Sequence, residues 1–148
     1  MSEPSMESPQ RSAGRDHFSL DLATDLSQVG EVVEAVAACC FAGVTATTRT
    51  RFRLCTVVAE AVANAMVYGN GNDPDRRVLV DVELHRDRVV VSVTDEGEGF
   101  DPAAVPDPTD DDMLESECGR GIFMIRRLAD AVSFNARGNT IWMTLPRC

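Results

Sequence analysis

The chain has 148 residues and a net charge of −10, and its 14 basic residues are all arginine. The absence of lysine excludes a P-loop lysine, a protein-kinase strand lysine and Schiff-base chemistry. The negative charge argues against nucleic acid as the main partner, because phosphate binding needs a basic surface. With 44% hydrophobic residues and no apolar run near the roughly 18–20 residues of a membrane helix, the composition predicts one globular domain without a membrane partner.

The amino-terminal part is predicted to be a tail that leads into a single domain. Residues 1–15 are polar and lack the apolar stretch of a signal peptide. We therefore expect a disordered tail, a folded domain over residues 16–148 and a cytoplasmic protein. Residues 16–22 alternate polar and apolar side chains, which predicts an edge strand. Either Asp25 or Ser27 then suits the cap of a first helix.

Two helices are predicted before residue 70. Apolar residues of the first helix recur every three or four positions, and Gly43 ends it. These residues are Val29, Val32, Val33, Val36, Ala37 and Cys40. The second helix spans about Thr45 to Tyr68, and the glycine-rich run 69–74 stops it. Its expected buried stripe consists of Phe52, Cys55, Val58 or Ala59, and Val62.

The five cysteines and two histidines predict neither a disulfide framework nor a metal centre. The number of cysteines is odd, and no two of them have C-x-x-C spacing. Cys39, Cys40 and Cys55 fall in the predicted helices, where we expect small core residues. His17 and His85 are distant in sequence, and we interpret both as structural.

The second half of the chain combines strands, one long loop and a third helix. Residues 77–84 and 88–94 predict a β-hairpin. Residues 101–118 are rich in proline and aspartate, which predicts a long loop that serves as a lid. Apolar side chains then mark one face of a helix over residues 122–129.

Residues 131–136 and 140–145 predict a second hairpin that closes the domain. The complete order is strand, two helices, two strands, loop, helix and two strands. This order predicts an α+β fold in which the helices pack on one face of a mixed, mostly antiparallel sheet.

The second helix carries the first candidate functional pair, Glu60 and Asn64. Residues four apart share a helix face, so both side chains point the same way, with Tyr68 one turn further on. A carboxylate beside a nucleotide can act as a general base, and a carboxamide oxygen suits Mg²⁺. Alone, Glu60 is as well explained as an exposed helix residue and Asn64 as a buried polar contact. The motifs that follow favour the functional interpretation.

Asp95, Gly97 and Gly99 form an acidic glycine turn at the end of the strand 88–94. A charge at the end of an apolar strand is costly without a partner. A carboxylate only accepts hydrogen bonds, so it suits the exocyclic amine of adenine. The glycines let the backbone approach a ligand without a Cβ. A simple acidic turn is the alternative, while a calcium loop lacks its alternating ligands here.

Gly119, Arg120 and Gly121 are predicted to open the third helix. Free N–H groups and the helix dipole at such an end can hold phosphate oxygens, and a guanidinium adds charged donors. A lone G-x-G is a weak signal, because a helix start also needs flexibility. The three motifs in this order are more specific, and together they indicate a nucleotide site.

The three motifs, E-A-V-A-N-A, D-E-G-E-G-F and G-R-G-I-F-M-I, resemble those of the histidine-kinase-like ATPase superfamily, which includes gyrase B and the heat-shock 90 chaperones. Over residues 16–146, the small size and short lid are similar to those of bacterial anti-sigma-factor serine kinases. The resemblance implies the Bergerat ATP-binding fold, a two-layer α/β sandwich that holds ATP and Mg²⁺ between sheet and helices.

The resemblance also implies roles for individual residues. Glu60 matches the catalytic base, Asn64 the magnesium ligand and Asp95 the adenine-binding carboxylate. The other implied nucleotide-binding residues are Gly97 and Gly99 in the turn beneath the nucleotide, Gly119, Arg120 and Gly121 at the phosphates, and Thr140 beside the adenine contact. Tyr68 stands where these kinases often carry histidine.

The implied function is that of an ATP-binding serine/threonine protein kinase acting as an anti-sigma factor. Such a protein binds a sigma factor in one state and phosphorylates an anti-sigma-factor antagonist protein in another, and a homodimer is compatible with this role. Two alternatives stay open. One is a non-catalytic adaptor that uses ATP only to order its lid. The other is the catalytic module of a split histidine kinase, which needs a separate chain for the phosphoacceptor histidine.

Overall fold

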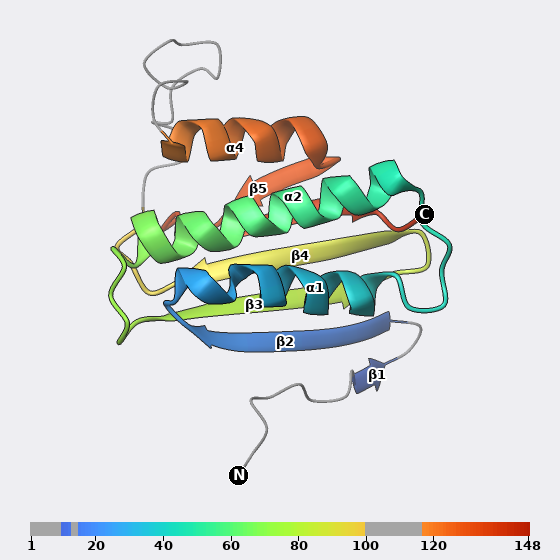
Figure 1. Cartoon of the computed structure of the whole chain (residues 1–148), viewed down its shortest axis with the longest axis horizontal. Coiled ribbons are helices and arrows are strands. Elements are labelled where there is room, and N and C mark those ends of the chain that lie inside the picture. Colours follow the sequence, from blue (N-terminus) through green and yellow to red (C-terminus); the bar gives the residue numbers. More distant parts are fainter. Residues whose placement is uncertain (1–9, 13–14, 100–116) are drawn as a thin grey trace.

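A computed structural model of the chain describes residues 10–12, 15–99 and 117–148 (Figure 1). The strands are β1 (Gln10–Ser12), β2 (Arg15–Ala23), β3 (Arg77–Leu84), β4 (Arg88–Asp95), β5 (Ala131–Phe134) and β6 (Thr140–Pro146). The helical segments are η1 (Leu26–Gln28), α1 (Val29–Cys40), α2 (Thr48–Asn64), the π-helical turn η2 (Ala65–Gly69) and α4 (Glu117–Leu128). The predicted element order is confirmed in this part of the chain.

The strands form one sheet in the order β1-β2-β3-β4-β6-β5. Every pairing between the described strands is antiparallel, so the mostly antiparallel sheet is confirmed, without a parallel pair in this part. Helices α1, α2 and α4 all cover the same face of the sheet (Figure 1). The fold is therefore the predicted two-layer α+β sandwich.

The amino-terminal segment differs from the prediction of a disordered tail over residues 1–15. Gln10–Ser12 forms the short strand β1, in which Gln10 pairs with His17 and Ser12 with Arg15. β1 covers the outer side of only the first residues of β2, Arg15 to His17. The rest of the predicted strand over residues 16–22 has no described strand on that side, in keeping with the predicted edge strand. A polar three-residue strand leaves no periodic signal in sequence.

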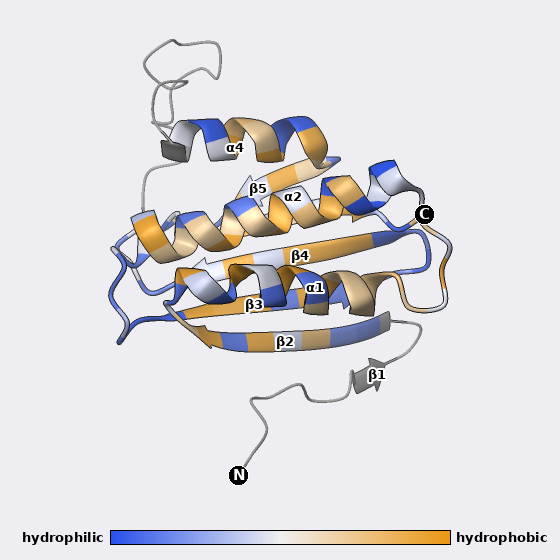
Figure 2. Cartoon of the chain, in the orientation of Figure 1, coloured by the Kyte–Doolittle hydropathy of each residue, from blue (hydrophilic) through white to orange (hydrophobic). Residues whose placement is uncertain are grey.

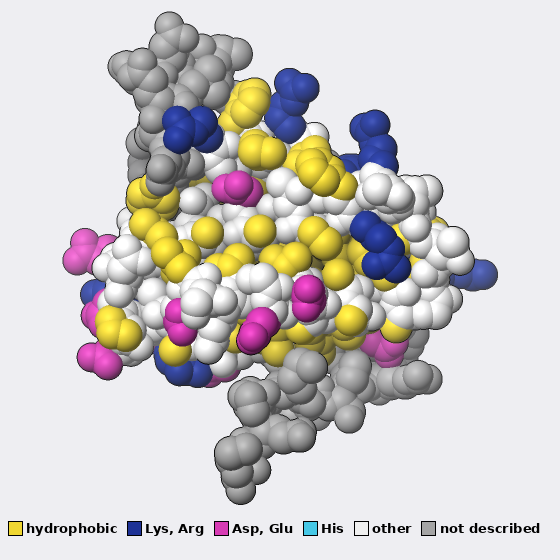
Figure 3. All heavy atoms as spheres, in the orientation of Figure 1, with side chains coloured by type: hydrophobic (Ala, Val, Ile, Leu, Met, Phe, Trp, Pro, Cys, Tyr) yellow, Lys and Arg dark blue, Asp and Glu magenta, His cyan; other side chains and the backbone are white. Residues whose placement is uncertain are grey.

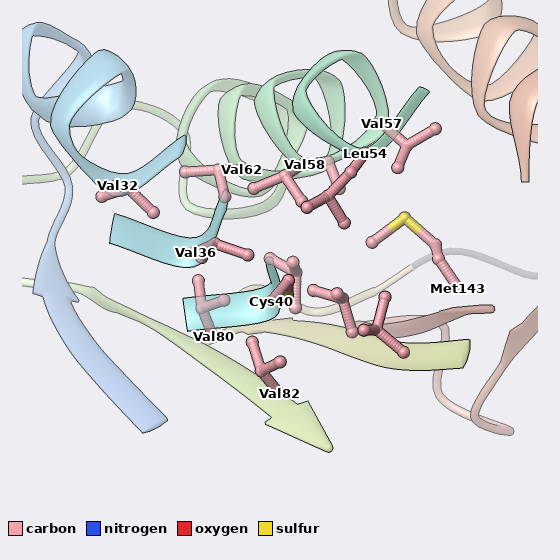
Figure 4. Close-up of a cluster of buried hydrophobic side chains, with 14 of the residues drawn as sticks. Val32, Val36, Cys40, Leu54, Val57, Val58, Val62, Val80, Val82 and Met143 are labelled. Carbon is pink, nitrogen blue, oxygen red and sulfur yellow. The ribbon is translucent and has the colours of Figure 1, made fainter. Parts of the chain in front are cut away.

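The core lies between the sheet and the helices α1 and α2. Alternate residues of β3 are buried, which directs Val78, Val80 and Val82 toward the helices. Figure 4 shows side chains from α1, α2, β3 and β6 pointing toward one another, including Val36, Val58 and Met143. Each fully buried side chain of this kind contributes about 1.5–3 kcal/mol. Figure 2 shows the same apolar character along the strands beneath the helices.

The buried face of α2 is rotated relative to the predicted stripe. Phe52 is 57% exposed, whereas Leu54 is fully buried. The buried side chains of α2 are Thr50, Leu54, Val57, Val58, Ala61 and Val62. Two overlapping apolar stripes run through the first half of this helix, and only packing against the sheet distinguishes them. The helix begins after Thr47, whose side chain accepts a hydrogen bond from the Thr50 N–H.

The cysteines behave largely as predicted. Cys40 is buried between the helices and the sheet, while Cys39 and Cys55 are half-buried, and each of the three is a free thiol. Burial raises the pKa of the Cys40 thiol to about 12. The thiolate is the reactive form of cysteine, so Cys40 is an inert core residue.

The segment predicted as a lid, residues 101–118, lies outside the described residues apart from Glu117 and Cys118, which begin α4. Within the described part of the chain, no helix is both long enough and apolar enough to cross a membrane.

Candidate functional site

Glu60 and Asn64 face Gly121 of α4, and these three residues are here called the helix-pair cluster. A Cβ added at Gly121 would lie 2.9 Å from Glu60 Oε2 and 2.8 Å from Asn64 Nδ2, closer than real Cβ atoms approach. Both side chains are half-buried. The predicted common face of Glu60 and Asn64 is therefore present, and it needs a glycine opposite.

The other end of the two helices fixes this arrangement. Arg53 Nε donates a hydrogen bond of 2.6 Å to the Leu128 carbonyl, and Arg53 Nη2 lies 2.8 Å from Asp130 Oδ1. Arg53 is near the start of α2 and Leu128 is the last residue of α4, so the helices run antiparallel. This pairing brings Gly121, near the start of α4, opposite Glu60 and Asn64.

The start of α4 differs from its predicted position relative to the glycine pair. The helix begins at Glu117, so residues 119–121 lie inside it rather than before it. Gly119 and Arg120 lie in the first turn of α4. Gly121 follows them, at the close contact with Glu60 and Asn64. The prediction placed residues 119–121 before a helix over residues 122–129, whereas the helix begins at Glu117.

The second group of site residues is the acidic-turn cluster, formed by Gly69, Asp95 and Gly97. Asp95 ends β4, and its Oδ1 accepts a 2.8 Å hydrogen bond from the Gly97 N–H. A Cβ at Gly69 would collide with the Asp95 carboxylate, and a Cβ at Gly97 would collide with the Gly69 carbonyl. The π-turn backbone therefore packs directly on the acidic turn, as close as glycine allows.

The environment of Asp95 alters its acidity. Burial raises the pKa of the Asp95 carboxyl, and this effect is opposed by the Gly97 hydrogen bond and by the charges of Arg137 and Arg76. The carboxylate is half-buried and accepts only one described hydrogen bond. It therefore retains acceptor capacity for a ligand that donates.

The hairpin between β5 and β6 holds the acidic turn from the other side. The Asp95 N–H donates to the Asn139 carbonyl at 3.0 Å, and Arg137 Nη2 donates to the Gly97 carbonyl at 3.2 Å. Gly99 has a φ of +83° and packs on the Arg137 carbonyl, where a Cβ would collide. The positive φ and the close Arg137 carbonyl therefore both require glycine at position 99.

Thr140 lies beside the acidic turn, as predicted. Its Oγ1 is 2.9 Å from Thr94 Oγ1, and either hydroxyl can be the donor. Thr94 directly precedes Asp95 in β4, so the threonine pair adjoins the carboxylate on the neighbouring strand.

Two site residues, Gly69 and Asn70, were assigned no role from sequence. They follow Asn64 through the π-turn η2, in which the Asn70 N–H donates to the Ala65 carbonyl five residues back. Such turns are rare and occur often at functional sites. The i to i+4 spacing used for Tyr68 no longer applies inside this turn, and Tyr68 is 48% exposed. The glycine- and asparagine-rich run from Tyr68 to Gly71 was the only sequence signal near this turn, and we interpreted it as the end of a helix.

One continuous helical segment contributes to both clusters. Asn64 ends α2, and Gly69 ends the π-turn that continues it. The segment carries the Glu60 carboxylate and the Asn64 carboxamide in α2. At its end, the Gly69 backbone packs against the Asp95 carboxylate. Figure 3 shows arginines gathered on the α2 and α4 side of the helical face and acidic side chains along α1.

Among the described residues, no group of three or more histidine, cysteine, aspartate or glutamate side chains could hold a metal ion. His17 pairs with Asp81 at 2.6 Å, in keeping with a structural role. Mg²⁺ in nucleotide sites uses one or two protein oxygens together with waters and phosphates. The adjacent oxygens of Glu60 and Asn64 fit that kind of ion, and not a metal held by protein alone.

Comparison with known protein families matches residues 19–145 to the histidine kinase-like ATPase domain. The matched range contains both clusters and every predicted site residue. An "Anti-sigma F factor" from Oceanobacillus iheyensis is 34% identical over 95 residues, which cover 60% of this chain and 64% of the relative.

Two further relatives carry the same name. The protein from Geobacillus stearothermophilus is 32% identical over 99 residues, covering 63% of this chain and 67% of its own. The protein from Priestia megaterium is 47% identical over 47 residues, covering 31% and 32% respectively. The chain spans slightly less than two thirds of the length of the Oceanobacillus relative.

Proposed function

Since the chain belongs to the histidine kinase-like ATPase domain family, we propose that it is an ATP-dependent serine/threonine protein kinase and anti-sigma factor of a partner-switching system. The observation that carries the proposal is that the single segment from α2 to η2 contributes to both clusters: it carries Glu60 and Asn64, and its last residue, Gly69, packs against the Asp95 carboxylate. The general-base candidate and the carboxylate proposed to bind adenine are thereby connected through one helical segment.

The acidic-turn cluster is proposed to bind adenine. Asp95 has free acceptor capacity for the exocyclic amine, and the glycine backbone beside it leaves room for a flat ring. Guanine presents a carbonyl oxygen in place of that amine, and two acceptors repel each other. The site should therefore prefer ATP to GTP. Thr140, Gly97 and Gly99 support the same contact.

The helix-pair cluster is proposed to act at the phosphates. Asn64 would hold Mg²⁺, which would neutralise phosphate charge. Glu60 lies beside Asn64 and accepts the proton of the attacking serine or threonine hydroxyl. Gly119 and Arg120 lie in the first turn of α4, where the helix dipole favours phosphate anions, and Gly121 keeps α4 close to Glu60.

The partners follow from the name that the relatives share. We propose that the chain binds a sigma factor in one state, and a small antagonist protein in another, which it phosphorylates. The experiment is incubation of the chain with labelled ATP, the co-encoded sigma factor and the co-encoded antagonist. Acid-stable phosphoserine or phosphothreonine on the antagonist supports the proposal. ATP binding without transfer would favour an adaptor, and acid-labile phosphohistidine would favour a split histidine kinase.

A further inference from the structure

Asn70 is a buried side chain that connects three parts of the fold. It is 2% exposed and follows the π-turn η2 directly. Its Nδ2 donates to Thr24 Oγ1 at 2.9 Å and to the Arg77 carbonyl at 3.0 Å, while its Oδ1 accepts from the Glu96 N–H at 2.8 Å. Both N–H groups of this buried carboxamide and its oxygen therefore have hydrogen-bond partners, as buried polar groups require.

Asn70, Arg77 and Glu96 form a closed ring of hydrogen bonds. Asn70 donates to the Arg77 carbonyl, the Arg77 N–H donates to the Glu96 carboxylate, and the Glu96 N–H donates back to Asn70. The ring joins the end of the helical segment, the first residue of β3 and the turn that follows β4. Each member orients the next, so the loss of one loosens the other two.

The ring adjoins the acidic-turn cluster. Gly69 directly precedes Asn70 and packs against the Asp95 carboxylate, while Glu96 directly follows Asp95. The peptide that links Asp95 to Glu96 is therefore oriented by the Asn70 amide. The same amide is anchored to the segment that carries Glu60 and Asn64.

We propose that Asn70 is a positioning residue that fixes the Asp95 carboxylate relative to α2 and thereby sets the preference for adenine over guanine. This inference rests on the proposed ATP site. A hydrogen bond depends on donor–acceptor distance and angle. A carboxylate held in place accepts a hydrogen bond from the adenine amine and repels the guanine carbonyl oxygen. A carboxylate that can rotate away makes both interactions weaker, so the preference for ATP over GTP decreases.

The test measures ATP and GTP affinities of the full chain by calorimetry, for the parent, Asn70→Ala and Thr24→Val. Asn70→Ala should lower the ratio of ATP to GTP affinity by about tenfold, the loss of one or two hydrogen bonds at the turn. Thr24→Val removes the Asn70 contact that lies outside the ring and should keep the ratio within about twofold, although it also removes the Thr24 bond to the Arg76 carbonyl.

Glu96→Ala provides a second variant in case Asn70→Ala does not fold. The Glu96 side chain is exposed, and its removal opens the ring only at the Arg77 N–H. The ratio should fall in the same direction by a smaller factor. The inference is overturned if folded Asn70→Ala keeps the parental ratio, or if both variants lose ATP and GTP affinity equally. A parent that shows no ATP binding would overturn the proposed function instead.

Discussion

The two clusters of the site are built from different kinds of contact. In the acidic-turn cluster, backbone meets backbone: Gly97 abuts the Gly69 carbonyl, and the neighbouring Gly99 abuts the Arg137 carbonyl. In the helix-pair cluster, the backbone of Gly121 meets only the ends of the Glu60 and Asn64 side chains. The first contact joins strand ends and a π-turn, and the second joins two helices.

This difference bears on how each end of the site can respond to a ligand. Backbone atoms in contact leave less room for adjustment than side-chain ends do, so the proposed base-recognising end is the more rigid one. The ends of flexible side chains can change rotamer at a cost of order 1 kcal/mol, so the reacting end can adjust. Rigid recognition beside an adjustable reacting end suits a protein that must hold one nucleotide while it engages different partners.

The largest expected effect is on chemistry at the helix-pair cluster. Glu60→Ala removes the proposed general base, which typically contributes about 10²–10⁴-fold, so phosphorylation of the antagonist should fall by that factor. ATP affinity should change little, because the carboxylate acts on the attacking hydroxyl. Transfer is measured with labelled ATP, and Glu34→Ala on α1 is the control. Parental transfer by Glu60→Ala would show that another group is the base.

The next effect compares the two glycine contacts directly. Gly97→Ala forces a Cβ into the Gly69 carbonyl and should destabilise the fold by about 1–3 kcal/mol. Gly121→Ala meets only side-chain ends, and alanine also favours a helix by up to about 1 kcal/mol, so its net effect should be much smaller. Denaturant unfolding measures both. Equal destabilisation by Gly97→Ala and Gly121→Ala would show that the acidic-turn cluster is no more rigid than the helix-pair cluster.

Asp95→Asn should separate binding from stability. Its amide places a possible donor at the adenine amine, and the lost hydrogen bond to a charged acceptor should weaken ATP binding by about 1–3 kcal/mol. Burial raises the pKa of Asp95 in the folded protein. The folded state therefore holds its proton more tightly, and its stability falls as pH rises from the ordinary carboxyl range through the raised pKa.

The asparagine variant does not titrate, so it should lack this loss of stability. At neutral pH its free energy of unfolding without nucleotide should equal or exceed that of the parent. Calorimetry with ATP and unfolding curves at acidic and neutral pH measure the two quantities. A variant that binds ATP as the parent does would refute the adenine assignment.

The smallest expected effect concerns the metal. Asn64→Ala removes one proposed ligand of Mg²⁺, while waters and phosphates keep most of the coordination. The increase in ATP affinity that Mg²⁺ gives should therefore shrink or disappear, and Asn64→Asp, which keeps an oxygen, should preserve it. Titrations with and without chelator measure this difference. An undiminished magnesium effect in Asn64→Ala would exclude the assignment.

Local patterns in the sequence were sufficient to predict most elements and several site residues. Alternation identified the strands, and spacing of three and four identified the helices, because these periods depend only on backbone geometry. The common face of Glu60 and Asn64 follows from the same rule. The roles of Asp95 and the neighbouring glycines were suggested by residue type at a strand end.

Only the tertiary structure decided which distant backbones meet. Asn70 and Glu96 are 26 residues apart and Asn70 and Thr24 are 46 apart, and nothing local distinguishes Asn70 from an ordinary turn residue. The buried phase of α2, which exposes Phe52, was likewise set by the sheet. Helix and strand periods are properties of single segments, whereas the contacts that assemble the site depend on how those segments pack.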